Sequence, residues 1–160
     1  MTYNQVIKEI QTILQSHPML NTVKFATPSE WVNRDEQPVF PISCFTIDRG
    51  QFNTGREQTY EIQIWFIDKS GVEGEFIEDV ISDMHQVSND FVSYLRKGSN
   101  PYTIDDQVSW TAISDKFDDY LSGITLTLNL SSMSEYGACD FPIQPIISGV
   151  FDNSFDNTFN

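Results

Sequence analysis

The chain begins with apolar residues spaced three and four positions apart, which is the period of an amphipathic helix. These residues are Val6, Ile7, Ile10, Ile13 and Leu14. Thr2 and Gln5 stand at the spacing of a capping box, and Pro18 cannot continue a helix. The pattern therefore predicts a short first helix that covers another element with one face.

From residue 22 onward the apolar period changes to about two, which is typical of strands. Residues 22–27 predict a short strand, and residues 38–48 predict a second with proline confined to its start. Residues 59–68 alternate strictly between apolar and polar side chains. The connection RGQFNTGRE carries two glycines, so the last two strands are predicted to form a long antiparallel hairpin.

The helical period returns between Ser70 and Gly98. One stripe joins Ile77, Val80, Ile81, Met84, Ser88, Phe91, Val92 and Leu95. Ser70 with Glu73 fits an N-terminal cap, and Gly98 fits a left-handed stop. We therefore expect a long amphipathic helix, followed by a turn at residues 99–103.

Two further strands are predicted at residues 107–117 and 120–132. In the second, apolar Ile124, Leu126 and Leu128 alternate with threonine and asparagine. One apolar and one polar face indicate an antiparallel sheet covered on one side. We expect an α+β fold in which an antiparallel sheet of four to five strands has two helices on one face. Residues 1–140 would form this single domain, and residues 141–160 an extended C-terminal arm.

Composition limits the classes of partner and compartment. The 160 residues include 23 acidic and 9 basic ones, a net charge of −14 that disfavours sequence-independent binding to nucleic acid. No run approaches the length of a membrane span, and the N-terminus does not read as a signal peptide. Cys44 and Cys139 lack metal-binding spacing, and buried thiols are favoured over a disulfide. We expect a soluble protein made in a cytoplasm.

No catalytic, cofactor-binding or metal-binding constellation stands out. His17 and His85 lack a second ligand at zinc spacing, and neither a phosphate-binding glycine loop nor a nucleophile elbow is present. The acidic residues Asp115, Asp118 and Asp119 lack the pattern of a calcium loop, so a solvated loop is the favoured interpretation. An enzyme would require a pocket that joins these carboxylates with a histidine, and we expect no enzyme.

The predicted hairpin tip carries a candidate interface. Arg49 and Arg56 bracket Phe52 in an otherwise acidic chain, and arginine and aromatic residues anchor protein interfaces. An interpretation of equal weight is that the tip is mobile and that its charges serve only solubility. The alternative hypothesis is that the tip contacts an acidic neighbouring copy.

The C-terminal sequence FDNSFDNTFN repeats phenylalanine every fourth residue, at Phe151, Phe155 and Phe159. A helix is disfavoured because Asn, Asp, Ser and Thr dominate the repeat. Termini are commonly disordered, yet each buried phenylalanine contributes roughly 1.5–3 kcal/mol. Two interpretations therefore stay open, a disordered end and an arm that docks on a neighbouring subunit or another protein.

The chain resembles phage neck and tail-completion proteins, and most closely the tail-terminator-like group. The resemblance covers residues 1–140 and is carried by the order of elements: a short helix, a hairpin ending in TYEIQIWFIDKSG, a helix through YLRKG, a strand YLSGITLTLNL and the polar stretch SMSEYGACDFP. The chain departs from the group in its extension beyond Pro142. The group has no catalytic residues to transfer.

The resemblance implies a non-enzymatic virion protein assembled in the host cytoplasm. It would form a ring of six or twelve copies between portal or connector proteins and tail proteins. DNA would pass through an acidic channel without specific binding. An alternative from another class is a small soluble adaptor that recognises a protein partner through a sheet edge.

Overall fold

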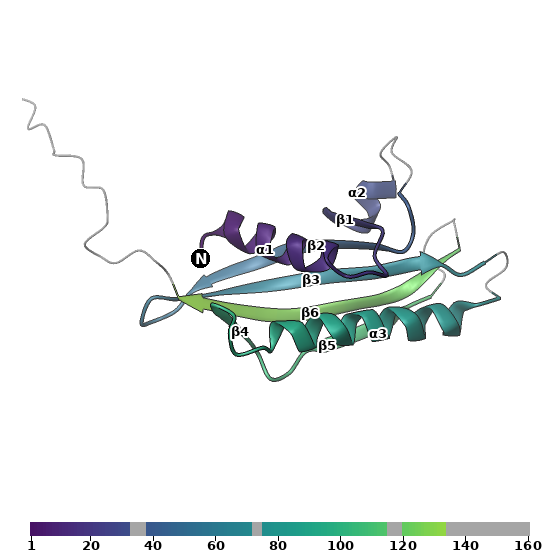
Figure 1. Cartoon of the computed structure of the whole chain (residues 1–160). Helices are drawn as coiled ribbons and strands as arrows, with labels where there is room; N and C mark the ends of the chain where they lie inside the picture. Colours follow the sequence, from purple (N-terminus) through teal and green to yellow (C-terminus); the bar gives the residue numbers. More distant parts are fainter. Residues whose placement is uncertain (33–37, 72–74, 115–119, 134–160) are drawn as a thin grey trace, which may run out of the picture.

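The computed structural model describes residues 1–32, 38–71, 75–114 and 120–133, which form an α+β fold (Figure 1). The predicted fold class is confirmed. Along the chain the elements are α1 (Tyr3–Gln15), β1 (Thr22–Phe25), α2 (Pro28–Val32), β2 (Ile42–Phe52), β3 (Glu57–Lys69), α3 (Ile77–Leu95), β4 (Tyr102–Ile104), β5 (Ser109–Ile113) and β6 (Leu121–Met133). The predicted boundary at residue 140 and the arm at 141–160 lie outside the described residues.

The sheet has six strands and mixed pairing, where four to five antiparallel strands were predicted. Its order is β1-β2-β3-β6-β4, and β5 pairs with β6 on the same edge as β4. β1 runs parallel to β2, because the chain crosses over through α2 before it returns to the sheet. β4 (Tyr102–Ile104) overlaps the end of the turn predicted at residues 99–103. It forms a strand because β6 is long enough to pair with both β4 and β5.

α1 and α3 cover the same face of the sheet, as expected (Figure 1). The third helix, α2, is one short segment beside β1 that the pattern did not predict. The core on the covered face is made chiefly of Val6, Ile10, Leu14, Phe45, Ile62, Ile64, Phe66, Val80, Met84, Val87, Phe91, Leu95, Ile124, Leu126, Leu128 and Leu130. Burial of apolar side chains such as these is the main favourable term for folding.

The helix ends match the sequence prediction at α1 and differ from it at α3. The Thr2–Gln5 capping box is present. α3 begins after Phe76 without a side-chain cap, because Ser70 is buried and donates its hydroxyl to the Tyr120 carbonyl at 2.6 Å instead. The prediction that Gly98 adopts a left-handed conformation is also wrong. The last turn is closed by Asn100, whose Nδ2 donates to two carbonyls of that turn at 3.1 Å.

The opposite face of the sheet is apolar at one end and polar along the rest. Ile42, Cys44, Ile67 and Leu121 form a small second cluster, with Phe40 and Trp65 packed against it. Beyond it, cross-strand register places polar side chains side by side, as in Thr46, Gln63, Thr127 and Ser109. The predicted division into an apolar and a polar face is therefore confirmed for most of the sheet.

Candidate functional site

The β2–β3 hairpin presents the three predicted tip residues to solvent but does not gather them on one face. Phe52 is 84% exposed, and Arg49 and Arg56 are also exposed. Arg49 pairs in register with Glu61 of the polar face, whereas Phe52 pairs with Gln58 on the side of the helices. The tip therefore offers a cation on one side and an aromatic ring on the other.

The local sequence explains the geometry of the tip. Gly55 has a φ of 82°, and Arg56 has a φ of 68°, a left-handed conformation that costs a non-glycine residue about 1 kcal/mol. The turn is closed by the Asn53 amide, which donates to the Glu57 carbonyl at 2.8 Å. The Asn53 side chain also donates to the Thr59 hydroxyl at 2.8 Å. These bonds hold the turn while the arginine side chains stay in solvent.

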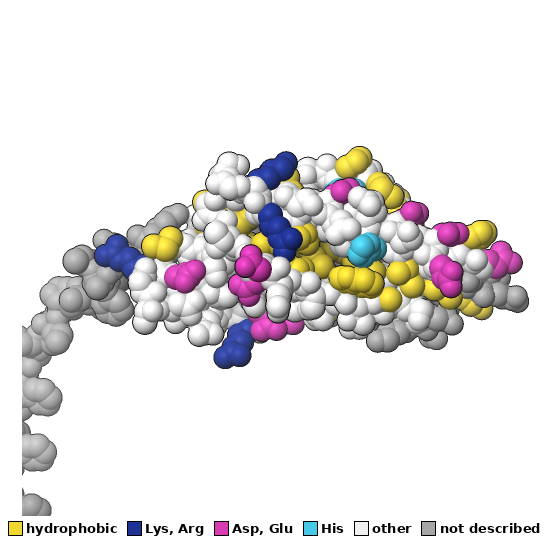
Figure 2. Space-filling view, turned by 90° about the horizontal axis from the view of Figure 1, so that it is seen from below, with side chains coloured by type: hydrophobic (Ala, Val, Ile, Leu, Met, Phe, Trp, Pro, Cys, Tyr) yellow, Lys and Arg dark blue, Asp and Glu magenta, His cyan; other side chains and the backbone are white. Residues whose placement is uncertain are grey.

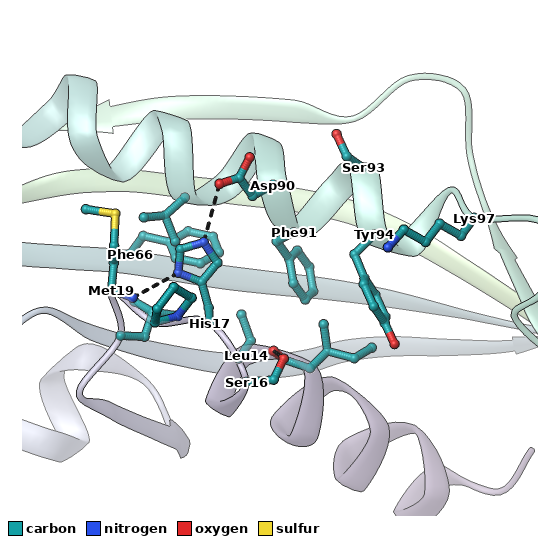
Figure 3. A pocket seen from close by; sticks show the side chains of 14 residues that line it. Leu14, Ser16, His17, Met19, Phe66, Asp90, Phe91, Ser93, Tyr94 and Lys97 are labelled. Carbon is teal, nitrogen blue, oxygen red and sulfur yellow. Dashed lines mark hydrogen bonds and ion pairs between the residues drawn. The ribbon is translucent and has the colours of Figure 1, made fainter.

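A groove opens between α1 and α3 on the covered face (Figure 3). We call it the helix groove; it has a volume of about 460 Å³ and is lined by Ile13, Leu14, Ser16, His17, Pro18, Met19, Leu20, Phe66, Val87, Asp90, Phe91, Ser93, Tyr94 and Lys97. Its floor is buried, with Phe91 stacked edge-on against Phe66 at a ring distance of 6.2 Å. Its rim is exposed, since Met19 and Tyr94 are 42% and 41% exposed.

Polar groups frame the rim of the helix groove. His17 Nε2 lies 3.5 Å from an Asp90 oxygen, and the other ring nitrogen of His17 accepts from the Met19 amide at 3.3 Å. Gln86 donates to the second Asp90 oxygen at 3.1 Å. The Lys97 ammonium lies 4.6 Å from the centre of the Tyr94 ring. The groove thus combines an apolar floor with a cation and two aromatic or thioether side chains at its edge.

A second cavity of about 640 Å³ lies between α3 and the segment that leads into β5. His85 and Trp110 approach each other there at 4.8 Å between ring centres, and Arg96 donates to the Asp106 carbonyl at 2.8 Å. Seen from below, hydrophobic side chains form an exposed band bordered by charged ones (Figure 2). The lining of this cavity is mostly polar, so it is less suited than the helix groove to an apolar side chain.

The described titratable groups with altered pKa, which include Cys44, Asp68 and Tyr102, lie on different strands and not in a common site. Burial raises the pKa of Cys44 to about 12. Burial, followed by the nearby Glu9 and Tyr94, raises the pKa of Tyr102 to about 12. Within the described ranges, no three His, Cys, Asp or Glu side chains are grouped to hold a metal ion. No helix in those ranges is both long and apolar enough to cross a membrane.

Several residues considered in the sequence lie outside the described residues. They are Phe151, Phe155, Phe159, Cys139, Asp115, Asp118 and Asp119. The helix groove was not predicted. Met19 and Tyr94 are large residues placed off the expected core stripe, but their positions in the sequence do not show that they share one rim. No protein-family model matches the chain, and no curated protein matches it significantly.

Proposed function

We propose that the chain is a structural virion protein that assembles into a ring in the neck of a tailed phage. The proposal rests mainly on one observation, the hairpin tip with Arg49, Phe52 and Arg56 exposed on a chain of net charge −14. Within the described ranges, neither guanidinium lies at ion-pair distance from a carboxylate. Two cations that extend from an acidic molecule favour contact with the acidic surface of another copy.

The position of the tip supports a ring more than a symmetric dimer. The tip lies at one end of the long β2–β3 hairpin, and its two cations would be repelled by the tip of another copy, so we infer that it meets a different, acidic patch on the next copy. Such heterologous contacts close into rings when the rotation between copies closes. The high negative charge is consistent with passage of DNA through the ring without adhesion. In this role the chain joins portal or connector proteins to tail proteins, and it has no catalytic function.

Native mass spectrometry of the full chain at several concentrations tests the ring. We expect a discrete species of about six or twelve copies. Arg49→Glu with Arg56→Glu should abolish that species, because the tip would repel an acidic neighbour. The matched control is Lys8→Glu with Lys69→Glu, which makes the same charge change at exposed positions away from the tip. Equal assembly by both double variants would contradict the role of the tip, and a dimer as the largest species would contradict the ring.

The alternative, an adaptor that binds a protein through a sheet edge, is favoured by β1. This strand of four residues is outermost in the described sheet, and its last residue, Phe25, is 40% exposed. An outermost strand can accept an extended peptide through backbone hydrogen bonds. The adaptor would be supported in place of the ring if the chain stayed monomeric at every concentration and bound an extended peptide along β1.

A further inference from the structure

The helix groove has the size and chemistry of a site for one or two aromatic side chains. Its volume of about 460 Å³ lies in the usual range of ligand clefts, about 300–1,000 Å³. Leu14 and Phe91 at its floor are 1% and 3% exposed, whereas Met19 and Tyr94 on its rim remain exposed. Figure 3 shows Phe91 and Tyr94 projecting from α3 toward the C-terminal half of α1, with Lys97 beside Tyr94. An inserted ring would cover this rim.

The chain itself contains a segment of matching chemistry. Residues 146–160 hold three phenylalanines at four-residue spacing, together with Asp152 and Asp156 and no basic residue. The phenylalanines suit the apolar floor of the groove. The acids suit Lys97, which is one of only nine basic residues in the chain. Asp90, the carboxylate of the groove, already accepts from Gln86 and lies beside His17.

We propose that the helix groove receives the phenylalanine-bearing segment 146–160 of a neighbouring copy. This inference rests on the proposed ring. The described chain ends at Met133, which pairs in register with Glu57 beside the hairpin tip. Phe66 of the groove floor lies nine residues further along β3, which is about 30 Å at about 3.3 Å per residue. The point from which the chain continues toward the segment and the floor of the groove thus lie at different places along the sheet.

This separation is what a heterologous contact requires, since one end of each copy meets a different patch on the next. Phe151 lies eighteen positions after Met133, and an extended chain of that length spans up to about 60 Å. The segment is therefore long enough to reach a groove about 30 Å away, and the proposed ring assigns it to the groove of the adjacent copy.

The first test measures binding of a fluorescein-labelled peptide of residues 146–160 by fluorescence anisotropy. The receptor is the full chain with Phe151→Ser, Phe155→Ser and Phe159→Ser, whose own segment no longer competes. Tyr94→Glu with Lys97→Glu, added to this receptor, should weaken binding by at least about tenfold. The matched control is Tyr3→Glu with Lys8→Glu, the same substitutions at exposed positions of α1 outside the groove. Equal binding by the groove and control variants, or by a peptide with its phenylalanines replaced by serine, would overturn the proposal.

The second test identifies the source of the segment. The wild-type chain, diluted until native mass spectrometry finds monomer, should bind the peptide as tightly as the serine variant does. Binding should then fall as the wild type assembles, because neighbouring copies fill the groove. A monomer that excludes the peptide would show that the segment folds back on its own subunit, which overturns the neighbouring copy as its source. If the peptide bound to the groove but the wild-type chain formed no species larger than a dimer, the ring would be refuted and binding of the segment to the groove would stand.

Discussion

Gly123 of β6 is the position where a single methyl group should do the most damage to the fold. It pairs with Ile67 of β3 on one side and Ile113 of β5 on the other, in the middle of the sheet. A Cβ at Gly123 would lie 1.9 Å from the Phe66 carbonyl oxygen and 3.0 Å from the Ile67 Cα. Both are backbone atoms of β3, so no side chain can rotate away.

The cost of Gly123→Ala follows from this geometry. Real Cβ atoms keep at least 3.0 Å from such neighbours, so β3 and β6 must separate locally by about 1 Å. We expect two ladder hydrogen bonds to be weakened, at about 1 kcal/mol each, and the strain of displacing the β3 backbone to add about 1–3 kcal/mol. The free energy of unfolding should fall by at least about 3 kcal/mol, which lowers Tm by roughly 6–12 °C for a chain of this size.

Urea unfolding followed by tryptophan fluorescence measures the change as a shift in midpoint at constant slope. Gly50→Ala is the control, because a Cβ there would meet only the Tyr60 ring, at 3.8 Å. That substitution should change stability by less than about 1 kcal/mol. If Gly123→Ala were no more destabilising than Gly50→Ala, the close approach of β3 and β6 at this position would be refuted.

Three further predictions follow from the described residues. In a Cys139→Ser background, Cys44 should react with Ellman's reagent only as fast as the protein unfolds, because burial raises its pKa to about 12; rapid reaction of the native protein would refute this. Burial also raises the pKa of Asp68, so its ionisation opposes folding above the ordinary carboxyl pKa. Asp68→Asn should therefore raise Tm at pH 7, with the gain vanishing toward pH 3; a gain that is equal at both pH values would contradict this cause. Thr2→Ala should lower the free energy of unfolding by about 1 kcal/mol, since it removes the acceptor for the Gln5 amide; Thr2→Ser, which keeps the hydroxyl, is the control in the same urea titration.

The sequence predicted those parts of the fold that depend on local periodicity. α1, with its capping box, and the alternating strands β3 and β6 were correct, because each buries one face and so has a clear period. The parallel pairing of β1 with β2 was missed, since a pattern along one strand does not identify its partner. The expected cap at Ser70 failed because tertiary contact with Tyr120 takes its hydroxyl.

The candidate site was predicted only in part. The hairpin tip could be located because glycine and arginine residues mark the loop in the sequence. The helix groove could not, because it depends on how far apart α1 and α3 lie on the sheet. Tyr94 and Met19 have no periodic relation to each other, and only the packed structure shows that they share one rim.

The placement of β6 sets the order of events when the protein is synthesised. Among the described residues β6 is the last strand, yet it lies inside the sheet, where it pairs with β3 on one edge and with β4 and β5 on the other. Until residues 121–133 leave the ribosome, the nascent chain has one edge of β3 unpaired and lacks the apolar strand on which α3 packs. Such unpaired edges and apolar surfaces are prone to aggregation. Completion of the sheet therefore waits for β6, and chaperone binding to nascent chains should end when residues 121–133 have emerged.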